Sequence, residues 1–275
     1  MLAIEDGRRK NRRGEVRIGL ALGGGFARGI AHVGVLRAFE RNRIPIHAIA
    51  GVSAGSIVAA AFAGGCTSDD IERVALSMKF KDVARWTINR RGLAGSHPMI
   101  AFLARLLKET RFERMKMPCA IVSTDLATGE PVTFKGEGDA VLAIRASCSY
   151  PGLFVPVHYE NRCLVDGFIS MEIPALPLRA MGATHVVSVS LPAPASCTEP
   201  GNLLGVVNRC FQVLSAHAAH EWRRESDIVI EPDVAGLSWD SFASAKKLIE
   251  LGEAAGEAVA PVLREWVGSE LAVAV

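Results

Sequence analysis

Residues 16–41 read VRIGLALGGGFARGIAHVGVLRAFER, and they contain the first of two similar units. An apolar run with one charge ends in three glycines, and residues 30–41 then place apolar side chains at helical spacing. That order predicts a strand, a glycine loop and a helix. Residues 46–62, IHAIAGVSAGSIVAAAF, repeat it at once. Two consecutive strand–turn–helix units predict parallel strands in a layered α/β fold.

Composition and charge exclude several classes of protein. The chain has 275 residues, of which 49% are apolar and 22% charged, as expected for a globular domain. Its formal charge of +2 is uneven, because residues 1–17 carry +3 and the remainder −1. A near-neutral body lacks the basic surface of a nucleic-acid-binding protein, so we expect no nucleic-acid partner.

The rest of the chain predicts one domain. We expect a disordered basic tail over residues 1–15, a single domain over 16–266 and a second tail over 267–275. Residues 69–117 look largely helical, and their apolar stripe, centred on Met99 and Leu103, leaves open either packing on the sheet or contact with a membrane. We expect further strands at 119–123, 130–134, 155–158, 163–165, 184–191 and 227–230, and late helices at about 203–224 and 241–266.

Six cysteines are scattered without a paired spacing, so they predict neither disulfides nor a zinc site. Positive charges near the N-terminus are not followed by an apolar segment, which argues against a secretory signal. The uncharged stretch 44–68 contains four glycines and a proline, which are unsuited to a membrane span. We therefore expect a cytoplasmic protein without transmembrane helices, and peripheral contact at the inner membrane face stays open.

Residues 51–55, GVSAG, fit the pattern G-x-S-x-G between a predicted strand and a predicted helix. A serine on such a sharp turn exposes its hydroxyl, and Gly51 and Gly55 let the turn close because they lack side chains. The helix that starts there directs free amides at the same point. Ser53 is therefore the candidate nucleophile, and a glycine- and serine-rich packing contact is the simpler alternative.

The glycine loop, residues 23–29 (GGGFARG), has three interpretations. A dinucleotide fingerprint fails because Arg28 or Phe26 stands where glycine is required, and a phosphate-binding loop fails because Ile30 replaces its lysine. What remains is an oxyanion hole, in which backbone amides of a loop without side chains approach a developing alkoxide. Arg28 would either add positive potential or brace the loop.

A nucleophile also needs a base, and no histidine stands in a recognisable catalytic pattern. The cluster His217-Ala-Ala-His220-Glu221 matches no metal motif, so we expect no metal and no cofactor. Asp166 follows the short apolar run 163–165 and precedes Gly167. A carboxylate at the end of a strand lies where parallel sheets form ligand crevices, although an aspartate in a turn is equally common.

These motifs together resemble the patatin-like phospholipase family, in its compact bacterial branch, over nearly all of residues 16–265. The matching segments are GGGFARGIAHVGVL (23–36), GVSAG (51–55), STDLATGE (123–130), ASCSYPGLFVPV (146–157), VDG (165–167) and IVIEPDVAGLSW (228–239). The resemblance implies a three-layer α/β/α fold with a mostly parallel central sheet. It also implies hydrolysis of lipid acyl esters by a Ser–Asp dyad, without a metal or cofactor.

In that resemblance Ser53 matches the family's nucleophile and Asp166 its base. The amides of Gly24, Gly25 and Phe26, with Arg28, match its oxyanion loop. Two positions depart from the family's usual pattern. Phe26 replaces a glycine or serine and narrows the loop, and Phe168 replaces a small residue after the Asp-Gly pair, where its bulk reshapes the acyl pocket.

Two alternative functions stay open at this point. One is an α/β-hydrolase esterase that completes a Ser-Asp-His triad with His185 or His220. The other is a non-catalytic lipid-binding relative that has kept the fold. The sequence indicates neither the physiological lipid or ester nor the oligomeric state.

Overall fold

The computed structural model describes residues 15–191, 199–238 and 240–271. Within these ranges eight strands form one sheet, in the order β10-β9-β1-β2-β5-β8-β7, with β6 paired to β5 outside this path. Their bounds are β1 Ile18–Leu22, β2 Ala48–Val52, β5 Cys119–Asp125, β6 Pro131–Lys135, β7 Val157–Tyr159, β8 Arg162–Asp166, β9 His185–Val189 and β10 Ile228–Ile230. A separate hairpin joins β3 (Arg85–Asn89) to β4 (Gly92–Gly95).

Strands β10, β9, β1, β2 and β5 pair in parallel, whereas β8 and β6 each pair with β5 in the antiparallel direction. The register aligns Leu22 at the end of β1 with Gly51 in β2, and Val52 with Val122 in β5. The carboxyl ends of these strands therefore lie side by side. Ser53 follows β2 at this edge of the sheet.

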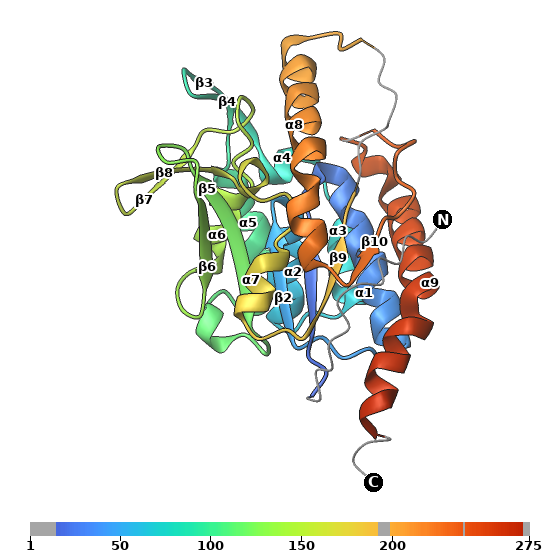
Figure 1. The fold of residues 1–275 in the computed structure, drawn as a ribbon. Coiled ribbons are helices and arrows are strands. Elements are labelled where there is room, and N and C mark those ends of the chain that lie inside the picture. Colours follow the sequence, from blue (N-terminus) through green and yellow to red (C-terminus); the bar gives the residue numbers. More distant parts are fainter. Residues whose placement is uncertain (1–14, 192–198, 239, 272–275) are drawn as a thin grey trace.

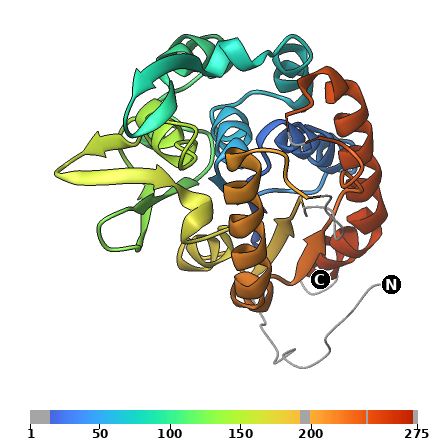
Figure 2. The same cartoon turned by 90° about the horizontal axis from the view of Figure 1, so that it is seen from above.

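Helices cover both faces of the sheet (Figure 1). Their bounds are α1 Ala31–Arg41, α2 Ala54–Ala63, α3 Ser68–Ala75, α4 Phe80–Val83, α5 His97–Leu106, α6 Ala140–Ser147, α7 Ala175–Ala180, α8 Leu203–Glu225 and α9 Ala245–Leu271. Short 3-10 turns are η1 Phe26–Ile30, η2 Phe112–Arg114, η3 Gly167–Ile169 and η4 Phe242–Ser244. Viewed from above, α9 and α8 lie on different sides of the strands (Figure 2). The predicted three-layer α/β/α fold with a mostly parallel sheet is confirmed.

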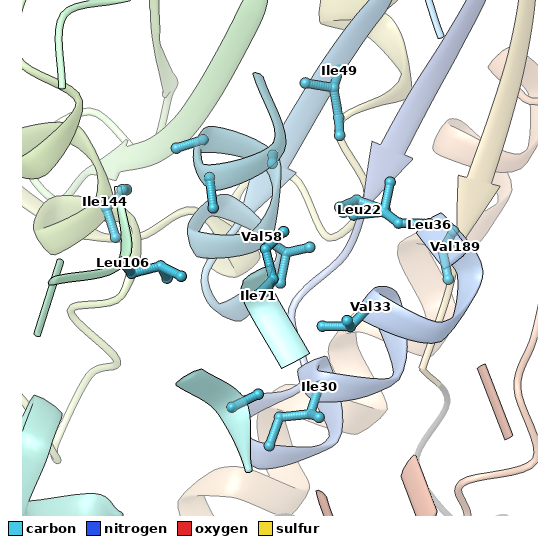
Figure 3. Packing of buried hydrophobic residues seen from close by; sticks show 14 of the residues in the cluster. Leu22, Ile30, Val33, Leu36, Ile49, Val58, Ile71, Leu106, Ile144 and Val189 are labelled. Carbon is cyan, nitrogen blue, oxygen red and sulfur yellow. The ribbon is translucent and has the colours of Figure 1, made fainter. Parts of the chain in front are cut away.

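The two faces of the sheet carry side chains of different size. Large residues such as Leu20, Leu22 and Ile49 face the main core, which they share with Val33 and Leu36 of α1 (Figure 3). The alternate positions include four alanines, which pack against α7 and the end of α8; they are Ala21, Ala48, Ala50 and Ala120. Because successive side chains of a strand point to opposite faces, this alternation lets α7 lie close to the sheet.

The prediction for residues 69–117 is wrong in part. Helices α3, α4 and α5 form there, but residues 85–95 form the hairpin β3–β4. The polar tip Asn89-Arg90-Arg91-Gly92 interrupts the helical spacing on which the prediction rested. The apolar stripe packs largely inside the protein, since Met99 and Leu103 are 2% and 0% exposed.

The predicted boundary of the C-terminal tail is also wrong. Helix α9 continues to Leu271, five residues beyond the expected end at 266, while residues 272–275 lie outside the described residues. The basic tail 1–15 lies outside them as well, except for Glu15. Helices α6 and α7 were not expected from the sequence, because each is shorter than three turns and shows little periodicity.

Candidate active site

The backbone of Ser53 is strained, as its position between strand and helix predicts. Its φ of 52° and ψ of −125° lie in a backbone region that residues other than glycine rarely adopt. A Cβ atom on Gly51 would lie 2.5 Å from the carbonyl oxygen of Gly55, and one on Gly55 would lie 2.3 Å from that of Leu22. These two positions require glycine because backbone atoms occupy the space of a side chain.

Asp166 reaches the same point from a different direction. Strand β8 runs antiparallel to β5 and aligns Asp166 with Ser123, so the carboxylate does not stand at the end of a parallel strand as expected. The strand enters the sheet from its carboxyl edge and ends level with Ser53. Ser53 Oγ donates a hydrogen bond of 2.7 Å to Asp166 Oδ2, and the amide of Phe168 donates one of 3.0 Å to Oδ1.

Burial changes the acidity of Asp166. Its side chain is 0% exposed, and this loss of hydration raises the pKa of Asp166 to about 7. Hydrogen bonds from the Phe168 amide and the Ser53 hydroxyl oppose that shift, because they favour the carboxylate. A carboxyl group with a pKa near 7 exchanges a proton readily at neutral pH, as a general base must.

This pKa predicts how activity and stability depend on pH. If Asp166 acts as a base, kcat/KM on a soluble ester should be half-maximal near pH 7 and fall about tenfold for each pH unit below 6. The raised pKa also means that the folded chain loses stability as pH rises from about 4 to 7. Urea unfolding at pH 4 and pH 8 should therefore show Asp166→Asn to be more stable than the parent at pH 8, with an advantage about 4 kcal/mol larger than at pH 4. A flat rate profile from pH 5 to 8, or an equal stability difference at both pH values, would contradict this assignment.

The glycine loop lies directly against the serine. A Cβ atom on Gly24 would lie 3.5 Å from Ser53 Cβ, and Gly29 packs on Ala54 at the start of α2. In the described part of the chain the amides of Gly24 and Gly25 have no hydrogen-bond acceptor. Two free amides beside a serine hydroxyl can receive an anionic oxygen.

Arg28 and Phe26 form the rest of the loop's wall. Arg28 is 6% exposed, and burial lowers the pKa of its guanidinium, which nevertheless stays charged at neutral pH. Phe26 has a φ of 52°, and its ring packs against Phe80 and Phe242 with centroid distances of 6.3 and 5.7 Å. The predicted site residues of the loop thus lie together with Ser53 and Asp166.

The two histidines of the alternative triad, His185 and His220, lie away from Asp166. The hydrogen-bond partners of Asp166 Oδ1 and Oδ2 among the described residues are Phe168 N and Ser53 Oγ, and neither is an imidazole. His185 begins β9, at the opposite edge of the sheet, and stacks on Trp266 at 4.6 Å. His220 lies exposed on α8, and its Nδ1 is 3.2 Å from the carbonyl oxygen of His217.

Two supporting residues were not found from the sequence. Ser147 Oγ accepts a 2.8 Å hydrogen bond from the Ser53 amide and donates one of 2.6 Å to the Val122 carbonyl, so it fixes the strained turn. His32 Nε2 donates to the carbonyl of Gly23 at 2.9 Å, and burial lowers the pKa of His32 to about 4, which keeps it neutral. Only the matching segment that begins at residue 146 pointed toward Ser147.

A cavity of about 670 Å³ opens above this serine. Gly24, Phe26, Ser53, Asp166 and Phe168 line its base. Helix α8 forms the opposite wall from Asn202 to Arg223, which the sequence did not indicate. Tyr150 ties α8 to the body through a 2.9 Å hydrogen bond to Asn208 and an edge contact with Phe211. The volume accommodates a long ligand.

Two features are absent from the described residues. No group of three or more histidine, cysteine, aspartate or glutamate side chains there could hold a metal ion. None of the described helices combines the length and the apolar character that a membrane span requires.

The structure defines a class of proteins in which a Ser–Asp pair lies at the edge of a parallel sheet. This class combines a layered α/β fold with a serine on a strand–helix turn, a buried aspartate and a glycine loop. The sequence model of the family described as Patatin-like phospholipase matches residues 20–179. This chain belongs to the patatin-like phospholipase family.

Similarity to known proteins supports this assignment. An NTE family protein of Mycobacterium tuberculosis is 32% identical over 207 residues, which cover 73% of this chain and 57% of that protein. Lysophospholipase NTE1 of Mycosarcoma maydis is 30% identical over 244 residues, 85% of this chain and 12% of the fungal protein. The chain therefore spans little more than half of the mycobacterial relative. The crystal structure of VipD from Legionella pneumophila shares the fold, with a TM-score of 0.54, 12% identity and coverage of 90% of this chain and 67% of that one.

Proposed function

We propose that this chain hydrolyses acyl esters of lipids with Ser53 as nucleophile and Asp166 as general base. The hydrogen bond of 2.7 Å between Ser53 Oγ and a buried carboxylate carries the proposal. A hydroxyl becomes a nucleophile when a base can take its proton as it attacks. Similarity to a protein named lysophospholipase supports a lipid ester as the substrate class.

The proposed reaction has two stages. Asp166 takes the proton of Ser53 Oγ as that oxygen attacks the ester carbonyl, and the negative charge that develops there is held by the amides of Gly24, Gly25 and Phe26. The intermediate collapses and releases the alcohol, which receives the proton from Asp166. Water, deprotonated by the same carboxylate, then attacks the acyl-serine; Ser53 Oγ leaves and takes that proton from Asp166, which frees the fatty acid and restores the enzyme. Each amide of such a site typically contributes about 3 kcal/mol to transition-state stabilisation.

The lining of the cavity supports a lipid as the substrate of this proposed reaction. Its apolar lining includes Leu153, Phe168, Leu191 and Val213, which suit an acyl chain, whereas Arg209 and His217 on α8 are polar neighbours for a headgroup. Peripheral contact with a membrane is part of this proposal, since the substrate would be drawn from a bilayer. The strained Ser53 beside a buried carboxylate favours an enzyme over a lipid carrier, because a carrier has no chemical need for either.

A panel of lysophospholipids, diacyl phospholipids, glycerides and short esters tests the activity. We expect release of fatty acid from at least one lipid class and covalent labelling of Ser53 by a fluorophosphonate. His185→Ala and His220→Ala should each retain kcat within about threefold, because neither imidazole contacts Asp166 and surface substitutions rarely have larger effects. Loss of turnover in one of these folded variants would favour the Ser-Asp-His triad. Absence of both labelling and turnover would favour a lipid-binding protein.

A further inference from the structure

The hairpin β3–β4 carries an unusual group of exposed side chains. Trp86 is 64% exposed and Leu93 44%, although both are large and apolar. The same hairpin carries three exposed arginines, namely Arg85, Arg90 and Arg91. We call these five residues the hairpin surface. Exposed tryptophan beside arginine is typical of protein segments that lie at a membrane–water interface.

The charges of this segment are not neutralised nearby. Between residues 79 and 95 there are five basic residues, and Asp82 is the one acid. Asp82 lies 3.8 Å from Arg105, and among the described residues neither Arg85 nor Arg90 has a carboxylate partner. Arg91 contacts His158 at 3.0 Å. The surface therefore combines a net positive charge with an indole that can enter an apolar layer, which fits an anionic bilayer.

The hairpin is attached to the wall of the active-site cavity. The amides of Leu93 and Ala94 in β4 donate to the carbonyl of Leu153 at 3.0 and 2.7 Å, and Leu153 lines the cavity. On the β3 side the ring of Trp86 packs on Phe80 at 5.4 Å, and Phe80 packs on Phe26 of the glycine loop at 6.3 Å. What docks on the hairpin thus lies next to the cavity that contains Ser53.

The start of α8 extends on the same side of the molecule as the hairpin (Figure 1). Leu203 and Val206 at this end of α8 are 78% and 46% exposed, so this end of the helix also presents apolar side chains to solvent. The cavity is lined by Leu153 and Phe26 on one side and by α8 on the other. A planar partner could contact both elements and cover the cavity between them.

We propose that the hairpin surface docks the protein on anionic phospholipid bilayers, with the active-site cavity facing the lipid. The inference rests on the proposed function for its choice of lipid as the partner. The arginines would contact lipid phosphates while Trp86 enters the interface, and a single lipid would then pass between β4 and α8 toward Ser53.

Sedimentation of the full chain with vesicles tests the docking. In this assay the parent and every variant also carry Ser53→Ala, so that hydrolysis does not alter the vesicles. The vesicles contain phosphatidylcholine with or without phosphatidylglycerol. We expect stronger binding to the anionic vesicles and its loss at high salt. Arg85→Gln/Arg90→Gln should weaken binding about 30-fold, since each basic group near an anionic surface contributes about fivefold. Trp86→Ala should weaken it about tenfold.

Two matched controls lie away from the hairpin. Leu176→Ala removes an apolar side chain of α7 that is 56% exposed, and Arg114→Gln removes an exposed arginine before β5, near the amino edge of the sheet. Both should bind vesicles as the parent does. Parent-like binding by the hairpin variants, binding without preference for anionic lipid, or binding that is lost only on deletion of residues 1–15 would each overturn the proposal. So would a change of oligomeric state in Trp86→Ala without a change in vesicle binding.

A soluble short-chain ester separates this proposal from the proposed function. With Ser53 restored, Trp86→Ala should hydrolyse that ester at the parent's rate while losing rate on anionic vesicles. If the parent hydrolyses no ester, the proposed function fails, and the sedimentation result still decides the docking. Equal loss on the soluble ester and on vesicles would show that the hairpin acts through the site, and would overturn a docking role.

Discussion

Ser53→Ala and Asp166→Asn should each lower kcat by about four to six orders of magnitude while the chain stays folded. Ser53→Ala removes the attacking oxygen, and Asp166→Asn leaves an amide that cannot accept the hydroxyl proton at 2.7 Å. Because the two groups act as one unit, the double variant should be hardly slower than either single variant. Release of fatty acid from the lipid class that the parent prefers provides the measurement.

Asp166→Asn also supplies its own folding control, because it should be more stable than the parent at pH 8. A variant that is inactive and equally or more stable separates chemistry from unfolding. Residual kcat above about a hundredth of the parent value in Asp166→Asn would remove this aspartate from the role of base. In Ser53→Ala the same result would move the nucleophile elsewhere.

Gly55→Ala should strongly destabilise the chain, lowering the free energy of unfolding by about 3 kcal/mol or preventing folding. Its new Cβ would lie 2.3 Å from the Leu22 carbonyl and 2.6 Å from that of Gly23, and neither backbone atom can rotate away. Since Gly23 begins the glycine loop, the displacement should lower kcat as well. Chemical denaturation of the purified chain measures the effect.

Gly236→Ala is the matched control, because a Cβ there would meet nothing within 4 Å. Its free energy of unfolding should stay within about 1 kcal/mol of the parent's. If the two variants proved equally stable, α2 would not pack on the end of β1 as closely as the structure has it.

Which elements could be predicted from the sequence depends on the range of the interactions that form them. The units at 16–41 and 46–62 were predictable because apolar spacing and glycine positions are local signals. The hairpin β3–β4 was missed for the complementary reason. Its β4 strand is held by Leu153 and Val155, some sixty residues away along the chain, and such pairing leaves no mark on local periodicity.

The residues of the candidate site also divide into those that local signals placed and those that only the structure placed. The sequence placed Ser53 on its turn and identified the glycine loop, but it gave Asp166 the wrong strand direction and said nothing of Ser147 or of the wall formed by α8. Resemblance to the family paired Ser53 with Asp166. The geometry of that pair depends on β5 lying between their strands.

By itself, the sequence determined that a serine follows an apolar strand on a turn that tolerates no side chain at positions 51 and 55, because those requirements lie within a few residues of one another. Only the tertiary structure decided that a carboxylate 113 residues further along the chain meets this hydroxyl, and that burial raises its pKa to about 7. The reason is physical: contact between distant strands and removal of water from a charge are set by what surrounds a group in space.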